Sequence, residues 1–204
     1  MKKTIVMLLA ITCAVACSKN KANEPTNHPA DHTEMSSSSN RTASTADSAE
    51  PSETSPGDSL LSDQDKRFAD AAAKGGMMEV MTGELAIKKG NSQTVKSLGQ
   101  MMVKDHTKAN NELKQWASAH SYTLPASLDA SQQKKYDELQ AAKGAEFDRM
   151  YTNQMVIDHQ KTIADFRQEV AQGSEKSLKE FAGKKIPALE HHLMESEKAK
   201  EAVK

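Results

Sequence analysis

Four residues whose side chains could bind a metal ion occur at positions that the sequence pattern assigns to the apolar faces of four separate helices. They are Glu79, His106, His159 and His192. A buried carboxylate or imidazole without a partner costs on the order of 1–3 kcal/mol, so four such residues on four helices are expected to meet. Three imidazoles and one carboxylate suit one divalent ion, such as Zn²⁺, Fe²⁺ or Cu²⁺, without a sharp choice between these metals.

A hydrogen-bond network inside the core is the alternative explanation. Each histidine could be a satisfied core residue, and the partners for such a network are Glu79, Asp148, Tyr151 and Thr162. Asp148 is also a weaker candidate ligand, because it lies on the inner face of its helix about three turns before His159. The sequence therefore leaves two functions open. One is a metal-binding module, and the other is a non-catalytic structural, interaction or stress-response module whose polar residues specify the packing.

Enzyme chemistry is the least favoured class of function. The sequence shows no Gly-rich phosphate loop, no Ser–His–Asp elbow and no cysteine within the predicted domain. A standard di-iron carboxylate centre is excluded as well, because it needs a Glu-x-x-His motif on each of two helices. Val103 stands three residues before His106, and Leu189 stands three residues before His192. We therefore expect a binding or structural protein rather than an enzyme.

Two further groups of residues have metal-binding side chains but simpler explanations. The methionines of the predicted helices could form a soft copper or silver site, although methionine at helical spacing more often fills a core. They are Met77, Met78, Met81, Met101, Met102, Met150, Met155 and Met194. A patch near the N-terminus contains His28, His32, Glu34 and Met35, and it is more simply explained as polar linker sequence.

The helices that must position these residues are indicated by apolar residues spaced by three and four. Four long helices are predicted at about 62–90, 92–120, 144–172 and from 174 onward, with a short helix at about 129–142. Ser62 and Asp65 form a capping-box pattern at the first helix, and Ser174 is expected to cap the last one. Pro187 lies inside that last helix, where we expect a kink or a break.

The lengths of the connections predict the arrangement of these helices. The first and second helices, and the third and fourth, are joined tightly and should run antiparallel, whereas the stretch from Ala119 to Gly144 can travel the length of a bundle. We therefore predict an all-α, ferritin-like four-helix bundle with one long crossover that carries the short extra helix. All four candidate ligands would then lie within about one helical turn of the same height.

The N-terminus resembles a bacterial lipoprotein signal peptide at residues 1–16. A short positive start precedes an apolar run of about a dozen residues, which is too short to span a bilayer. Ala14 and Ala16 precede Cys17, whose thiol would carry the lipid after cleavage. The alternative is an ordinary secretory signal cleaved near Ala16. Ser18 follows Cys17, and under the lipoprotein sorting rule this favours the outer membrane, with the domain facing the periplasm.

Composition separates a tether from the folded domain. Residues 17–59 are rich in Ser, Thr, Asn, Pro and acidic residues and have almost no large apolar side chain, so we expect a disordered linker. Residues 60–204 are enough for one core. The net charge of −1 argues against nucleic acid as a partner. The expected partners are the membrane, through the N-terminal lipid, and other envelope proteins, while the oligomeric state is not indicated.

Several stretches of the predicted domain together resemble domain-of-unknown-function family 4142. They are Ala71 to Ala86, Met102 through His106, Asn111 through Leu113, Leu124-Pro125, Phe147-Asp148 with Tyr151, Asp158-His159, and Pro187 through Leu193. The resemblance covers essentially all of Leu60 to Val203. It implies a ferritin-like fold and a bacterial envelope location, often the outer membrane, and it implies no activity.

Overall fold

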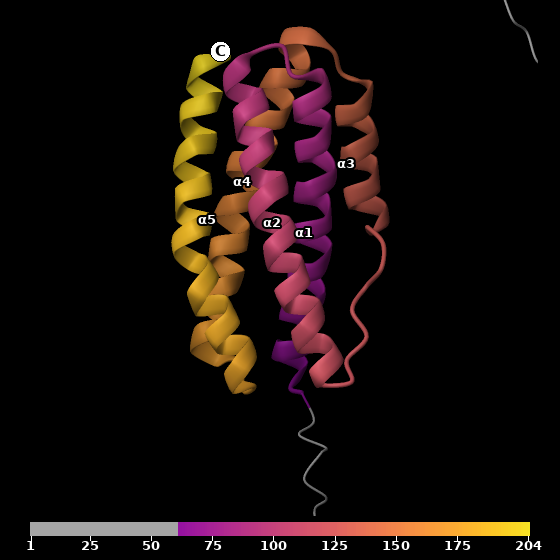
Figure 1. Cartoon of the computed structure of the whole chain (residues 1–204), viewed down its shortest axis with the longest axis vertical. Coiled ribbons are helices and arrows are strands. Elements are labelled where there is room, and N and C mark those ends of the chain that lie inside the picture. The colour runs from indigo at the N-terminus through magenta and orange to yellow at the C-terminus, as the bar shows by residue number, and fades with distance from the viewer. Residues whose placement is uncertain (1–60) are drawn as a thin grey trace, which may run out of the picture. The chain divides into compact units, whose positions relative to one another are not determined.

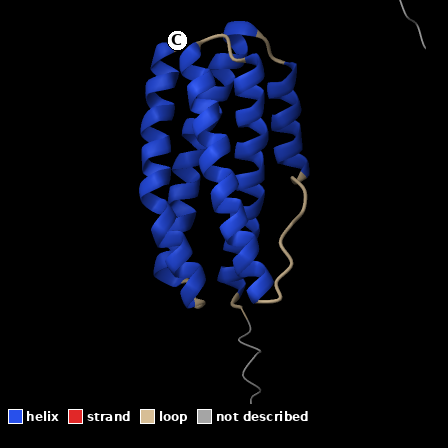
Figure 2. Ribbon diagram, viewed as in Figure 1, coloured by secondary structure: helices blue, strands red, loops and turns tan. Residues whose placement is uncertain are grey.

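The computed structural model of the protein describes residues 61–204, and this part of the chain contains five α-helices and no strand. The helices are α1 (Asp63–Lys89), α2 (Gln93–Ala119), α3 (Ala130–Ala141), α4 (Gly144–Gln172) and α5 (Lys176–Ala202) (Figures 1 and 2). The predicted signal peptide, Cys17 and the tether lie outside the described residues. None of the described helices combines the length and the apolar character needed to cross a membrane.

Local capping explains where most of these helices begin. The Ser62 hydroxyl accepts the backbone N–H of Asp65, whose carboxylate accepts the backbone N–H of Ser62, so the predicted capping box is present. Asp129 caps α3 in the same way. The prediction for α5 was wrong by one residue. Glu175 is the N-cap because its carboxylate accepts the N–H of Leu178.

Pro187 does not break α5, which continues as one helix from Lys176 to Ala202. Proline removes the hydrogen bond to the carbonyl four residues earlier, here that of Gly183. The Pro187 ring is exposed, so this carbonyl lies on the side of the helix where water can reach it. Ala182 and Leu189 are buried on either side of the proline and hold the helix against the core.

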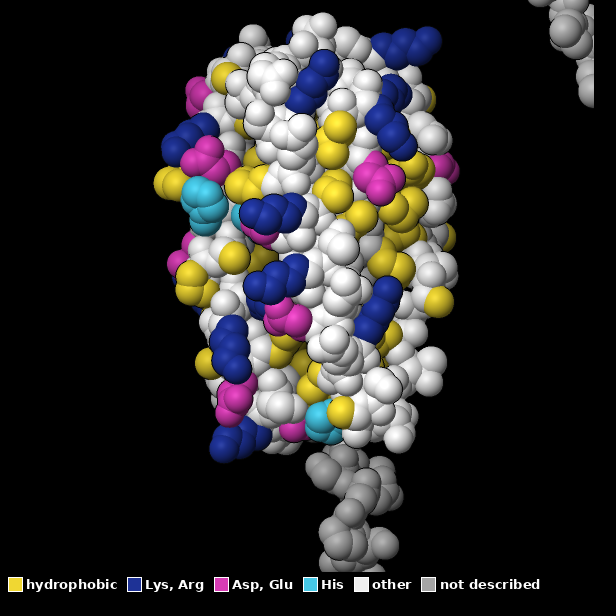
Figure 3. Space-filling view, in the orientation of Figure 1, with side chains coloured by type: hydrophobic (Ala, Val, Ile, Leu, Met, Phe, Trp, Pro, Cys, Tyr) yellow, Lys and Arg dark blue, Asp and Glu magenta, His cyan; other side chains and the backbone are white. Residues whose placement is uncertain are grey.

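The four long helices lie side by side as two hairpins (Figure 1). The α1–α2 hairpin packs against the α4–α5 hairpin, with α1 next to α4 and α2 next to α5, and α3 lies beside α1. The only long connection among the described helices runs from α2 through α3 to α4, as the sequence predicts. On the face drawn in Figure 3, lysines and acidic residues are interspersed, so no patch of one charge sign covers it.

The two hairpins repeat the same structural plan. Near the start of α4, Asp148 accepts the backbone N–H groups of Asn91 and Ser92 in the α1–α2 turn, at 2.8 Å each. Near the start of α1, Asp65 accepts the N–H groups of Ser174 and Glu175 in the α4–α5 turn. Asp65 precedes Ser92 by the same number of residues as Asp148 precedes Glu175. Each hairpin therefore fixes the turn of the other.

The core is divided into two apolar clusters. One includes Phe68, Leu113, Phe166 and Leu178, and the other includes Leu85, Met102, Tyr151 and Met155. On every long helix, the candidate ligand predicted from the sequence stands between the segments that belong to the two clusters. Glu79, His106, His159 and His192 therefore form a polar layer across the middle of the core.

Close contact between α1 and α2 depends on two glycines. A Cβ added at Gly99 would lie 2.7 Å from the Gly83 carbonyl oxygen and 2.8 Å from the Ala86 Cβ. A Cβ added at Gly83 would lie 3.0 Å from the Gly99 carbonyl oxygen. Real side chains do not fit at these distances, so the two backbones touch here. This contact sets the spacing of the hairpin that carries Glu79 and His106.

Candidate metal centre

Three histidines from three helices meet in the polar layer. His106 on α2, His159 on α4 and His192 on α5 each offer one ring nitrogen, and these three nitrogens lie within 4.8 Å of one another. All three side chains are buried. The ring centroids are 5.3–5.7 Å apart in each pair. Three of the four candidate ligands predicted from the sequence therefore lie together, and their binding of a metal ion stays a prediction.

The hydrogen bond of His159 to its own helix determines which nitrogen faces the centre. Its Nδ1 lies 2.9 Å from the backbone oxygen of Met155, which can only accept, so Nδ1 carries the proton. Nε2 then holds a lone pair. This lone pair points towards His192, whose Nδ1 lies 3.4 Å away.

His192 is oriented in the same manner from outside the core. Its Nε2 lies 3.0 Å from Oδ2 of Asp105, so Nε2–H donates to the carboxylate and Nδ1 holds the lone pair. The 3.4 Å approach therefore brings two lone pairs together, with no proton between them. A cation placed between the two nitrogens would remove this repulsion and bind to both.

His106 contributes an unpaired nitrogen to the same layer. Its Nε2 is buried and has no hydrogen-bond partner. Metal–nitrogen bonds of about 2.0–2.1 Å place neighbouring ligand nitrogens roughly 3.3–3.6 Å apart. His159 and His192 already have this separation. The nitrogen of His106 lies within 4.8 Å of the other two and would need to approach them by up to about 1.5 Å. The residues present thus fit one ion bound by three imidazoles.

Burial keeps the three imidazoles neutral near pH 7, which metal binding requires. It lowers the pKa of His159 to about 4, although the bond to Met155 opposes this change. It lowers the pKa of His106 well below the usual range, and the neighbouring histidines add to the shift. Burial also lowers the pKa of His192, against the effect of Asp105.

Glu79 lies beside the histidines but outside the group of three nitrogens. Its Oε1 is 3.7 Å from Nδ1 of His159, the nitrogen that faces away from His192, and its Oε2 is buried without a partner. Burial, aided by Asp158, raises the pKa of this carboxyl well above its usual range. In this geometry Glu79 contacts the far side of a candidate ligand rather than the ion position.

The sequence matches one protein family over residues 50–199. This chain belongs to the family described as Domain of unknown function (DUF4142). No curated protein matches the sequence.

Among solved structures, this DUF4142 protein is similar to CopM in its Cu(II)-bound form, with 17% identity and a TM-score of 0.58 over 68% of this chain and 96% of that chain. CopM in its Cu(I)-bound form gives 18% identity and a TM-score of 0.55, over 66% of this chain and 93% of that one. CopM in an Ag-bound form obtained by soaking gives 18% identity and a TM-score of 0.54, over 66% of this chain and 92% of that chain. At this level of identity the likeness shows a shared all-helical fold.

The structure places Asp148 away from the histidines of this DUF4142 protein. Both of its carboxylate oxygens accept backbone N–H groups of the α1–α2 turn, and the residue stands about three helical turns from His159. Asp148 therefore has a structural role in this geometry. The hydrogen-bond partners of the histidines also differ from those expected from the sequence. His159 bonds to the Met155 carbonyl of its own helix, and His192 bonds to Asp105.

Asp105 is the residue that sequence reasoning did not assign to the site. The only available signal was its position directly before His106, which by itself does not distinguish a site residue from a surface residue. Its contact partner is on α5, and the side chain is partly exposed. The bond between Asp105 and His192 depends on how α2 packs against α5, which the spacing of apolar residues does not specify.

Proposed function

We propose that this protein binds one transition-metal ion through His106, His159 and His192. The observation that carries the proposal is the 3.4 Å approach of two ring nitrogens whose partner nitrogens already donate to Met155 and Asp105. Neutral imidazoles arranged in this way direct their lone pairs towards one position, where an ion would bind to both. The unpaired Nε2 of His106 supports a third bond.

Copper is the first ion to test, with zinc and iron as alternatives. Imidazole binds all three and gives no sharp choice between them. The likeness in fold to CopM, whose structures are described as bound to Cu(II), Cu(I) and Ag, supports copper as the starting point. Met102 and Met155 give no added support, because both pack in an apolar core cluster.

The proposed setting is the bacterial cell envelope, with the protein anchored by a lipid on Cys17 and the domain in the periplasm. Support comes from the N-terminal sequence alone: a positive start, a short apolar run, and small residues before the cysteine. Replacing Cys17 with Ser should move the full chain from the membrane fraction to the soluble fraction. An unchanged membrane fraction would contradict lipid anchoring.

A structural network without metal is the second candidate. Two contacts favour it: the bond of His159 to Met155 and the bond of His192 to Asp105 each satisfy one ring nitrogen without an ion. This candidate leaves Nε2 of His106 without a partner, and it leaves the lone pairs of His159 Nε2 and His192 Nδ1 facing each other. It predicts that replacing a histidine changes stability and leaves metal affinity unaffected.

Single alanine variants of His106, His159 and His192 separate the two candidates. We expect each to lower the affinity for Cu²⁺ or Zn²⁺ by more than about 100-fold in a competition titration, since losing an orienting partner alone costs 10–100-fold. His191→Ala is the matched control, because His191 is the exposed neighbour of His192. Equal affinities in the control and the three variants would favour the structural network.

A further inference from the structure

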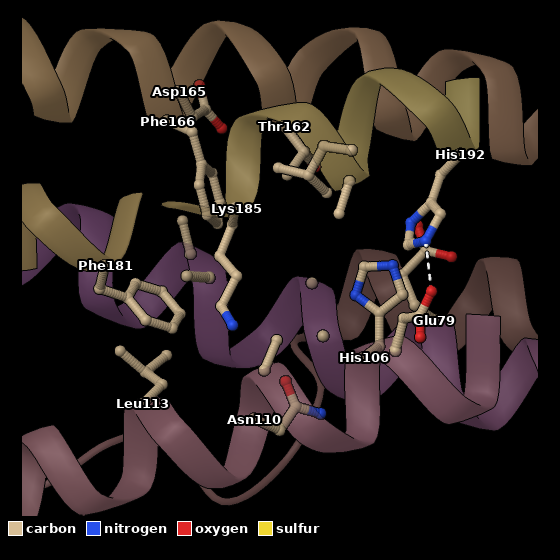
Figure 4. A pocket seen from close by; sticks show the side chains of 18 of the residues that line it. Glu79, His106, Asn110, Leu113, Thr162, Asp165, Phe166, Phe181, Lys185 and His192 are labelled. Atoms are coloured by element: carbon tan, nitrogen blue, oxygen red, sulfur yellow. Dashed lines mark hydrogen bonds and ion pairs between the residues drawn. The ribbon is translucent and has the colours of Figure 1, made fainter. Parts of the chain in front are cut away.

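A cavity of about 70 Å³ lies between α1, α2, α4 and α5 and adjoins two of the three histidines (Figure 4). His106 and His192 border it at one end. Three phenyl rings border it farther along and form a continuous wall: those of Phe68, Phe166 and Phe181. The centroid of the Phe166 ring lies 4.8 Å from that of Phe68 and 6.2 Å from that of Phe181. The cavity therefore joins the candidate metal ligands to an apolar surface.

We propose that this cavity binds a small neutral molecule that completes the coordination of the metal ion. The molecule would present one nitrogen or sulfur atom to the ion and an apolar body to the phenyl rings. This inference rests on the metal-binding function proposed above, because the ion is one of its two attachment points.

The repeat of the two hairpins explains why the space is hollow. The two hairpins can be aligned by placing Asp65 of the first on Asp148 of the second. In this alignment Gly76 stands at the position of His159, and Ala109 stands at the position of His192. Both small residues line the cavity. Asn110 takes up part of the freed volume, because a Cβ added at Gly76 would lie 1.9 Å from its Oδ1. The remaining volume lies where a second pair of imidazoles would otherwise pack.

The size and chemistry of the cavity limit what it can bind. One water needs roughly 10–15 Å³ of such a volume, so about 70 Å³ accommodates about five small groups, the size of a five-membered heteroaromatic ring. The phenyl rings offer a water no hydrogen bond, so the part of the cavity beside them favours an apolar group. The ammonium group of Lys185 is already paired with Glu112 at 2.5 Å. A neutral ligand therefore fits better than an anion.

The ion would lie at the edge of this cavity. Three imidazoles leave at least one position open on a transition-metal ion. His106 and His192 both border the cavity, whereas His159 does not. The open position is therefore expected on the cavity side, within reach of a ligand whose ring lies against the phenyl wall.

Imidazole is the probe that tests this inference. The full chain loaded with Cu²⁺ is titrated with imidazole and followed by electron paramagnetic resonance. We expect a saturable change in the copper spectrum of the parent protein. Ala109→Leu should fill the cavity without removing a ligand, and at least a tenfold higher imidazole concentration should then be required. Ala72→Leu, also on the cavity wall, is the second variant if the first does not fold.

Ala119→Leu is the matched control, because it adds the same side chain to an exposed position on α2. The control should respond to imidazole as the parent does. Two results would overturn this inference and leave the metal-binding function standing. One is an equal response to imidazole in Ala109→Leu and in the control, and the other is a copper-loaded parent protein that does not respond to imidazole. Elemental analysis of each sample detects a different failure: if copper does not bind to the parent, the metal-binding function falls and this inference falls with it.

Discussion

Asp105 determines which nitrogen of His192 faces the other two histidines. Its carboxylate accepts a hydrogen bond from Nε2–H, which leaves the lone pair on Nδ1 directed at His159. A carboxylate in this position also makes the imidazole a more basic ligand. The partly exposed Asp105 thus controls the chemistry of a buried ring without touching the ion position.

Asp105→Asn should weaken metal binding without abolishing it. We expect a 10–100-fold loss of Cu²⁺ or Zn²⁺ affinity, because the amide removes the charge that holds the tautomer of His192. Asp158→Asn is the matched control. Asp158 also directly precedes a histidine of the site, but its carboxylate accepts a hydrogen bond from Gln154. Equal losses in the two variants would contradict the role given to Asp105.

The sequence predicts which residues meet, but it does not predict how each ring is oriented. Glu79, His106, His159 and His192 stand out because polar residues at apolar positions of a helix are visible in one dimension. Which ring nitrogen faces inward depends on contacts between helices, such as that of His192 with Asp105. For the same reason the sequence could not show that Glu79 lies on the Nδ1 side of His159.

At the scale of the helices, the touching backbones of α1 and α2 hold two of the candidate residues at a fixed spacing. Gly99→Ala should destabilise the protein by about 1–3 kcal/mol, because the new Cβ would overlap the Gly83 carbonyl oxygen and Ala86. Gly75→Ala is the control. A Cβ at Gly75 meets nothing within 4 Å, so this change should be neutral or stabilise by up to about 1 kcal/mol. Urea unfolding measures both variants, and equal free energies of unfolding would contradict this packing.

Glu169 makes the junction of α1, α4 and α5 sensitive to pH. Burial and the nearby Asp65 carboxylate raise its pKa to about 7, against the effect of its bond from Gln64. In the unfolded chain a glutamate has a pKa of about 4.3. Because the folded pKa is the higher one, the stabilising effect of the bound proton is complete at low pH and is lost as the pH rises towards 7 and above.

Glu169→Gln should therefore stabilise the protein at pH 8 and have little effect at pH 4. The expected gain at pH 8 is up to about 3 kcal/mol, because the glutamine replaces a buried carboxylate by a neutral group of the same shape. The free energy of unfolding in urea at the two pH values tests this. A gain of the same size at both would show that titration of Glu169 is not the cause.

Helix bounds were predicted within a residue or two, because caps such as Ser62 with Asp65 are local signals. The error at Ser174 has a local cause as well. Asp65 of the other hairpin accepts the backbone N–H groups of both Ser174 and Glu175, and the carboxylate of Glu175 accepts the N–H of Leu178, so α5 begins one residue later than predicted. At Pro187 the local signal was misleading. Proline favours a break, but its buried neighbours keep α5 continuous.

At the scale of the whole molecule, the two hairpins carry the same plan but not the same centre. The carboxylates that fix the turns, Asp65 and Asp148, occupy equivalent positions, whereas His159 and His192 correspond to Gly76 and Ala109. Few residues are identical between the hairpins, so the repeat was not visible in the sequence. Residues 61–204 therefore contain one histidine cluster and, at the equivalent place, a cavity.

Metal content tests the central claim most directly. The full chain, purified without a histidine tag, is incubated with Cu²⁺, Zn²⁺ and Fe²⁺ in turn, desalted, and analysed by elemental mass spectrometry beside the His106→Ala, His159→Ala double variant. We predict close to one ion per chain in the parent and none in a double variant whose helical circular dichroism is unchanged. No metal in either protein, or equal metal in both, would contradict the claim that the three histidines form a metal site.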